Sequence, residues 1–199
     1  YIEGSKGLTG KFQRPTPQRC IKYDYELQLK LSDQFKEELE KAGVKNKKRV
    51  TLGDKDAYLA PKVFIRQSAT EIIATYCDKP YAANNSIYIL TNKENTEQSK
   101  SMLKYTCGVL NSDLVTFYCR INKIIRAEKG KTPQIKISDL KDVRIHVDNH
   151  YFEEIVQIVE QLLRNPKDKM LSRRLNELVY IIYGIDENER KFITDYLTA

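Results

Sequence analysis

The sequence lacks tryptophan, has only four cysteines in 199 residues and contains no long apolar run. A membrane-spanning helix needs about eighteen or more consecutive apolar residues, so we expect no membrane protein here. The cysteines are 57, 30 and 12 positions apart, and none forms a C-x-x-C pair. That spacing suits neither a zinc site nor a small disulfide framework. It predicts reduced, mostly buried thiols in a cytoplasmic protein.

Motifs of common enzyme classes are also missing. Neither G-x-G-x-x-G nor G-x-x-x-x-G-K-[ST] occurs, so a dinucleotide fold and a P-loop are unsupported. His146 and His150 could share one helix turn, but no H-E-x-x-H pattern or paired cysteine accompanies them, which favours capping or surface roles over a metal site. Acids alternate with lysines at helical spacing, as in "FKEELEK", a pattern typical of solvated ion pairs. The sequence predicts no active site and no metal site.

The net charge of +7 is distributed unevenly. Residues 1–150 carry a net +9, and residues 151–199 carry a net −2. A basic region followed by a slightly acidic tail is typical of a polyanion-binding domain with an attached packing element. A solvated lysine-rich surface has the same composition, so charge alone leaves both interpretations open.

The first half of the chain predicts an irregular arm, one helix and a small sheet. Glycines and prolines dominate residues 1–25, where we expect an arm with a short strand near residues 20–23. Ser32 as a cap and Gly43 as a stop predict a helix over residues 33–42. The segments "KVFIRQ", "IIATYC" and "SIYIL" combine β-branched and aromatic residues between turn residues, which predicts three successive strands.

The second half predicts mainly helices. From Leu103 onward apolar residues recur every three or four positions, with a break at Asn111 and Ser112, and "IKI" follows as a short strand. Two amphipathic helices then lie on either side of Pro166, and Asp186 with Glu189 resembles the capping box of a last helix. The apolar stripes of the amphipathic pair either close the domain's own core or serve a partner, and the second alternative would favour a homodimer.

The order of four segments resembles a known family. These segments are "PKVFIRQSATEIIATYCDKPYAANNSIYIL", "LKYTCGVLNSDLVTFYCR", "IKISDLKDVRI" and "LNELVYIIYGIDENERKFI". Together, over about residues 58–197, they are similar to the TaqI-like C-terminal specificity domain. That module is the target-recognition part of type I and type IIG restriction–modification enzymes and their relatives in phage defence.

The resemblance implies an α+β fold: a mixed β-sheet recognition domain with flanking helices over residues 1–148, then a C-terminal helical packing or spacer segment over residues 149–199. It implies that the partner is double-stranded DNA and that methylation and cleavage belong to other domains of the same or a partner chain. S-adenosylmethionine and Mg²⁺ are expected for those domains and no cofactor for this one. The chain lacks the N-P-P-Y-type tetrapeptide of amino-methyltransferases and a D…E-x-K cluster, and its start at Tyr1 predicts a fragment of a longer protein.

Two alternatives remain open on the residues alone. The chain could be a protein-interaction domain whose basic surface is incidental, or an enzyme fragment with an unrecognised nuclease or methyltransferase site. The predicted DNA contacts are Lys45, Lys47, Lys48, Arg49, Arg66, Arg120, Lys123, Arg126, Lys129 and Lys131. Arg66 has the chemistry to read guanine but, from its strand position, could equally brace the core. We expect base-reading side chains in the loops 45–57 and 126–134, and we expect Asn84 and Asn85 to start the third strand.

Overall fold

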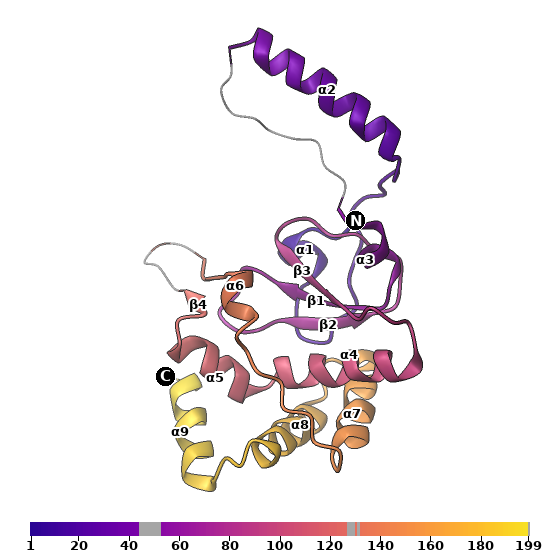
Figure 1. Ribbon diagram of the computed structural model, residues 1–199. Helices are drawn as coiled ribbons and strands as arrows, with labels where there is room; N and C mark the ends of the chain where they lie inside the picture. Colours follow the sequence, from indigo (N-terminus) through magenta and orange to yellow (C-terminus); the bar gives the residue numbers. More distant parts are fainter. Residues whose placement is uncertain (44–52, 127–129, 131, 199) are drawn as a thin grey trace.

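The computed structural model describes residues 1–43, 53–126, 130 and 132–198. A small sheet lies above a layer of helices, with a helix projecting from one end (Figure 1). The sheet contains β1 (Lys62–Arg66), β2 (Ala74–Cys77) and β3 (Ile87–Thr91) in the order β2-β1-β3, with both pairings antiparallel. The three predicted strands and the α+β class are confirmed. Within the described part of the chain the sheet is antiparallel rather than mixed, and the parallel contact of Ile2 with Ala83 is an isolated bridge.

The N-terminal arm covers one face of the sheet. After the short α1 (Gly4–Gly7) the chain is irregular to Asp24, so the strand predicted near residues 20–23 is wrong. Ile2 and Leu8 are fully buried against the side chains of Phe64 and Ile87. These contacts remove apolar surface from water on the side of the sheet that no long helix covers.

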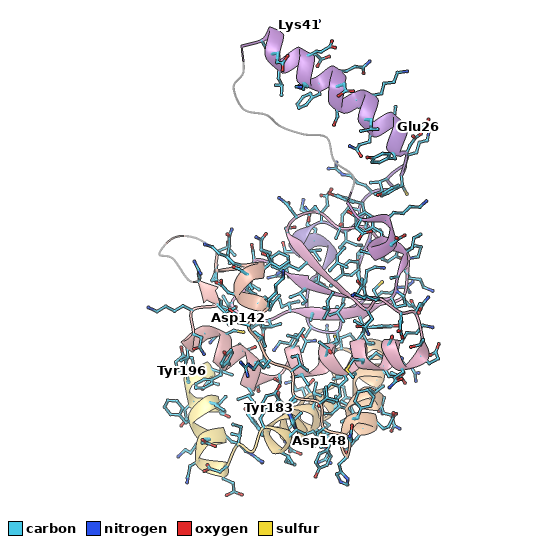
Figure 2. All side chains as sticks on the ribbon, viewed as in Figure 1. Glu26, Lys41, Asp142, Asp148, Tyr183 and Tyr196 are labelled. Atoms are coloured by element: carbon cyan, nitrogen blue, oxygen red, sulfur yellow. The ribbon has the colours of Figure 1, made fainter. Side chains whose placement is uncertain are left out.

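The first long helix, α2 (Tyr25–Lys41), is longer than predicted because it begins at a different cap. The Asp24 carboxylate accepts a hydrogen bond from Leu27 N at 3.0 Å, so the helix starts well before Ser32. Its predicted end is confirmed, since Gly43 adopts a φ of +67° just beyond it. No residue of α2 is buried, and Figure 2 shows its side chains, from Glu26 to Lys41, clear of the sheet. The short α3 (Lys55–Leu59), capped by Asp54, was not predicted.

On the other face of the sheet lie α4 (Glu97–Leu110) and α5 (Asp113–Ile121), with the predicted break at Asn111 and Ser112. The Ser112 hydroxyl accepts a hydrogen bond from Val115 N at 3.2 Å and so caps α5. A hairpin of β4 (Ile125–Arg126) and β5 (Gln134–Ile135) follows, then α6 (Ile137–Leu140). The strand predicted over residues 135–137 therefore lies one residue earlier, and its last residue begins α6.

The C-terminal helices α7 (Phe152–Arg164), α8 (Lys169–Ile182) and α9 (Glu187–Thr198) confirm the three predicted helices. Two backbone–carboxylate hydrogen bonds of 2.9 Å between Asp186 and Glu189 form the predicted capping box. None of the helices over the described ranges is long and apolar enough to cross a membrane.

The apolar stripes of α7 and α8 lie in the same buried cluster as the sheet and α4. Ile155, Val159 and Leu162 of α7 are fully buried, as are Leu178 and Val179 of α8. These helices therefore complete the chain's own core, which is one of the two alternatives that the sequence left open. The boundary at residue 148 and a homodimer through the C-terminal helices stay predictions.

One buried side chain, at the junction of α4 and α5, joins the helices to the edge strand β2. The Asn111 carboxamide accepts a hydrogen bond from Ala74 N at 2.9 Å and donates one to Ala74 O at 2.9 Å. Asn111 is only 4% exposed. Because β2 is an edge strand, these bonds satisfy backbone groups that no neighbouring strand could reach.

We predict that Asn111→Ala lowers the free energy of unfolding by about 2–3 kcal/mol, since Ala74 N would be left buried without an acceptor. Urea denaturation would measure the change. Asn188→Ala, at an exposed position in α9, is the matched control and should alter the stability by less than about 0.5 kcal/mol. Equal effects of the two substitutions would contradict this role of Asn111.

Candidate nucleic-acid interface

A cleft of about 880 Å³ lies where the N-terminal arm, the end of the sheet and the β4–β5 hairpin meet. In Figure 1 this is the region around α1, β4 and α6. Among the described residues that line it, the side chains are polar or basic and none is acidic. The lining residues are Gly4, Ser5, Arg66, Ser68, Ser86, Arg126, Thr132, Gln134 and Lys136. Three cations and several neutral hydrogen-bonding groups therefore face one concave surface.

The hairpin supplies Arg126 and Gln134 to this surface through the alternation of its strands. Ile125 pairs with Ile135 and both are buried, whereas Arg126 pairs with Gln134 and both are exposed. Successive strand residues point to opposite faces, so the apolar pair faces the core and the polar pair faces outward. Lys136, two residues after Gln134, is exposed as well.

Two hydrogen bonds fasten the hairpin to the sheet. Ile135 N donates to Gln67 O at 2.8 Å, and the Tyr88 hydroxyl donates to Ile135 O at 2.8 Å. Both backbone groups of Ile135 are thus held by segments of the central sheet. The outward side chains of the hairpin consequently project from a fixed base.

Arg126 is held by a carboxylate beside the cleft. Its Nη2 lies 2.6 Å from Asp139 Oδ2, and Asp139 also accepts a hydrogen bond from the Ser138 hydroxyl at 2.8 Å. The hydrogen bond from Ser138, followed by that from Arg126, lowers the pKa of Asp139 below its usual range. Asp139 therefore stays ionised near neutral pH and orients the guanidinium of Arg126. The carboxylate also neutralises part of the positive charge of that guanidinium.

Arg66 lies in the cleft wall but binds backbone carbonyls. Its Nε donates to Ser68 O at 2.7 Å, and its Nη1 donates to Leu8 O at 3.4 Å. These bonds join the end of β1 to the N-terminal arm, which supports the bracing interpretation of Arg66. Its positive charge still contributes to the potential of the cleft.

Two other predicted cations lie among the described residues, and neither lines the cleft. Arg120 in α5 donates through Nε to Thr70 O at 3.0 Å, and neither it nor Lys123 lines the cleft. Lys123 and Arg126 do not share a helix face, because α5 ends at Ile121 and Lys123 takes a φ of +55° in the turn that follows. The remaining predicted cations lie outside the described residues: Lys45, Lys47, Lys48, Arg49, Lys129 and Lys131.

Gln134 and Lys136 are cleft residues that were not named as sites from the sequence. The signal was present in "QIK", because a buried isoleucine in a strand implies that both of its neighbours point to the opposite face. Asn84 behaves as expected at the start of the third strand: its carboxamide oxygen accepts hydrogen bonds from the backbone N–H, at 3.2 Å, and the hydroxyl of Ser86. It is a turn residue rather than a cleft residue.

The described residues contain no group of three or more His, Cys, Asp or Glu side chains that could hold a metal ion. His146 and His150 lie in the connection between α6 and α7 and not on a helix. This connection is fastened by Tyr183, whose hydroxyl donates to Arg144 O and accepts from His146 N, each at 2.9 Å. Figure 2 labels Tyr183 and, in the connection, Asp148. Burial raises the pKa of the Cys107 and Cys119 thiols to about 12, so these thiols are unreactive.

Comparison with known protein families gives a match to the TaqI-like C-terminal specificity domain over residues 22–145. The chain belongs to this family. The matched region includes α2, the sheet, α4, α5 and the hairpin, and it contains all the described lining residues of the cleft except Gly4 and Ser5. It begins earlier than the resemblance at residue 58 suggested, and it ends before α7. No curated protein matches the chain.

In this specificity-domain chain we predict that Arg66→Ala lowers the free energy of unfolding by about 1–2 kcal/mol. The reason is the loss of charge-assisted hydrogen bonds to the carbonyls of Ser68 and Leu8. Urea denaturation measures the effect, with Arg173→Ala on the exposed side of α8 as the control. An unchanged midpoint for Arg66→Ala would show that the arginine does not brace the arm.

Proposed function

We propose that the chain recognises a specific sequence of double-stranded DNA as the specificity domain of a restriction–modification enzyme, without catalysis of its own. The observation that carries this proposal is the cleft, in which Arg66, Arg126 and Lys136 converge with the carboxamide of Gln134 on the scaffold of a specificity-domain family. The cations suit phosphates, and the amide and hydroxyl groups suit base edges.

The charge distribution supports a polyanion as the partner. The net +9 of residues 1–150 belongs to the part of the chain that contains the cleft, whereas the net −2 of residues 151–199 belongs to the helices behind the core. Lysine and arginine on one face neutralise phosphates and release condensed counterions, which supplies affinity that does not depend on sequence. Double-stranded DNA is the polyanion that a specificity domain would meet.

We assign catalysis to methyltransferase and nuclease domains of the same or a partner chain, as in a type I or type IIG system. S-adenosylmethionine and Mg²⁺ would be bound by those domains. Among the described residues no three carboxylate, histidine or cysteine side chains converge. We propose that the assembled enzyme acts in the cytoplasm, on the DNA that it protects or cleaves.

We predict that the chain binds duplex DNA with an affinity that falls steeply as salt rises. Lys136→Gln should weaken binding to all sequences and reduce the magnitude of the slope of log K against log[salt] by about one. Fluorescence anisotropy over a salt series measures both quantities. The matched control is Lys167→Gln, at an exposed position between α7 and α8, which should leave affinity and slope unchanged. A flat salt response of the unmodified chain, or no binding at low salt, would contradict the proposal.

We also expect the chain to produce no methylated and no cleaved DNA when it is incubated with duplex, Mg²⁺ and S-adenosylmethionine. The described residues bring together no set of metal ligands for phosphoryl transfer, and the sequence lacks the N-P-P-Y-type tetrapeptide of amino-methyltransferases. Gel electrophoresis and transfer of a labelled methyl group measure the two reactions. Turnover in either assay would overturn the assignment of catalysis to other domains.

A further inference from the structure

We infer that Gln134 reads an adenine through the major groove and is the side chain of the β4–β5 hairpin that determines specificity. This inference rests on the proposed function and deepens it by naming the base. It follows from the geometry of the hairpin, from the chemistry of the carboxamide and from the hydrogen bonds and ion pair that the neighbouring arginines already make.

The hairpin has the form of a two-stranded ribbon with one free face. Ile125 and Ile135 anchor its inner face in the core, while Arg126 and Gln134 lie directly opposite each other on the outer face. The major groove of B-DNA, about 12 Å wide, admits a two-stranded β-ribbon. Side chains of an opposed pair project together, so Arg126 and Gln134 would approach the same stretch of the duplex.

Gln134 has the functional group that adenine requires. Its carboxamide offers an acceptor and a donor, which match N6–H₂ and N7 of adenine in a bidentate pair. Gln134 is the one carboxamide among the described residues that line the cleft. Its side chain makes no hydrogen bond with any other described residue, so reading a base would break no existing contact.

The three cations among the described residues of the cleft are less suited to this task. Arg66 already donates to two backbone carbonyls, and Arg126 is paired with Asp139 at 2.6 Å. Lys136 is a point charge without the planar geometry that distinguishes one base edge from another. Arg126 and Lys136 therefore place the ribbon against phosphates, and Gln134 remains to read the base.

The base of the ribbon is fixed enough to make such a contact selective. The backbone of Ile135, the residue after Gln134, is held on both sides by Gln67 O and the Tyr88 hydroxyl, each at 2.8 Å. A reader on a rigid element keeps its geometry, so that a mismatched base loses hydrogen bonds and is not accommodated by movement of the backbone.

The test is selection of bound duplexes from a randomised library by the unmodified chain, Gln134→Ala and Gln134→Arg, followed by affinity measurements on the selected site. Gln134→Ala should lose the preference for A·T at one position, with a reduction of roughly 5- to 150-fold in discrimination there. Its salt slope should be unchanged, because the amide is neutral. Gln134→Arg should shift the preference at that position from A·T to G·C.

Gln157→Ala, exposed on α7, is the matched control and should select the same sequence as the unmodified chain. The outcomes distinguish a failure of the proposed function from a failure of the role of Gln134. If the unmodified chain binds no DNA or selects no sequence, the proposed function fails. If it selects a sequence and Gln134→Ala selects the same one with equal stringency, recognition stands and the role of Gln134 is refuted. A urea midpoint equal to that of the unmodified chain confirms that each variant is folded.

Discussion

The fold depends on the hydrogen bonds that the side chain of Asn111 makes with the backbone of Ala74. The N–H and C=O of Ala74 point away from β1, because hydrogen bonding alternates along an antiparallel pair. Since β2 is an edge strand, no further strand lies on that side, and the carboxamide of Asn111 bonds both groups. Ala74 O also accepts a hydrogen bond from Phe12 N at 3.0 Å. The sheet, the junction of α4 with α5 and the N-terminal arm thus meet at one residue. A buried polar group is stabilising only when it is fully paired, and here the pairing fixes three segments at once.

The residue types in the segment "GVLNSDL" follow from the contacts that they make around Ala74 and the junction of α4 with α5. Gly108 permits close approach of α7, because a Cβ there would lie 2.7 Å from Val159 Cγ2. Asn111 joins the helix junction to β2, and Ser112 caps α5. Asp113 N then donates to the Asn176 carboxamide of α8 at 2.9 Å. The residues of this motif serve backbone geometry and helix packing, and none of them lines the cleft.

The sequence predicts the scaffold well where local chemistry and burial agree. The three strands, the break at Asn111 and the capping box at Asp186 each combine a hydrophobic period with a specific turn or cap residue. Prediction failed where tertiary contacts decide. Helix α2 starts at an Asp24 cap that its exposed leucines did not signal, and strand β4 of the hairpin was not predicted. The site was predicted only in part, because the cleft is formed by the arm, β1 and the hairpin, which are far apart in the sequence.

Residues that support the fold are easier to predict from the sequence than residues that would recognise DNA. A residue such as Arg66 or Asn111 is constrained by several partners, so its type and position carry a pattern that can be recognised. A residue such as Gln134 is exposed, has no hydrogen-bonding partner for its side chain within the described structure and is constrained only by the DNA that it would contact. Its position can change identity at little cost to stability, since the ribbon is held through Ile125, Ile135 and the backbone. A scaffold built in this way can change its target by substitution on the outer face of one hairpin while the core keeps its structure.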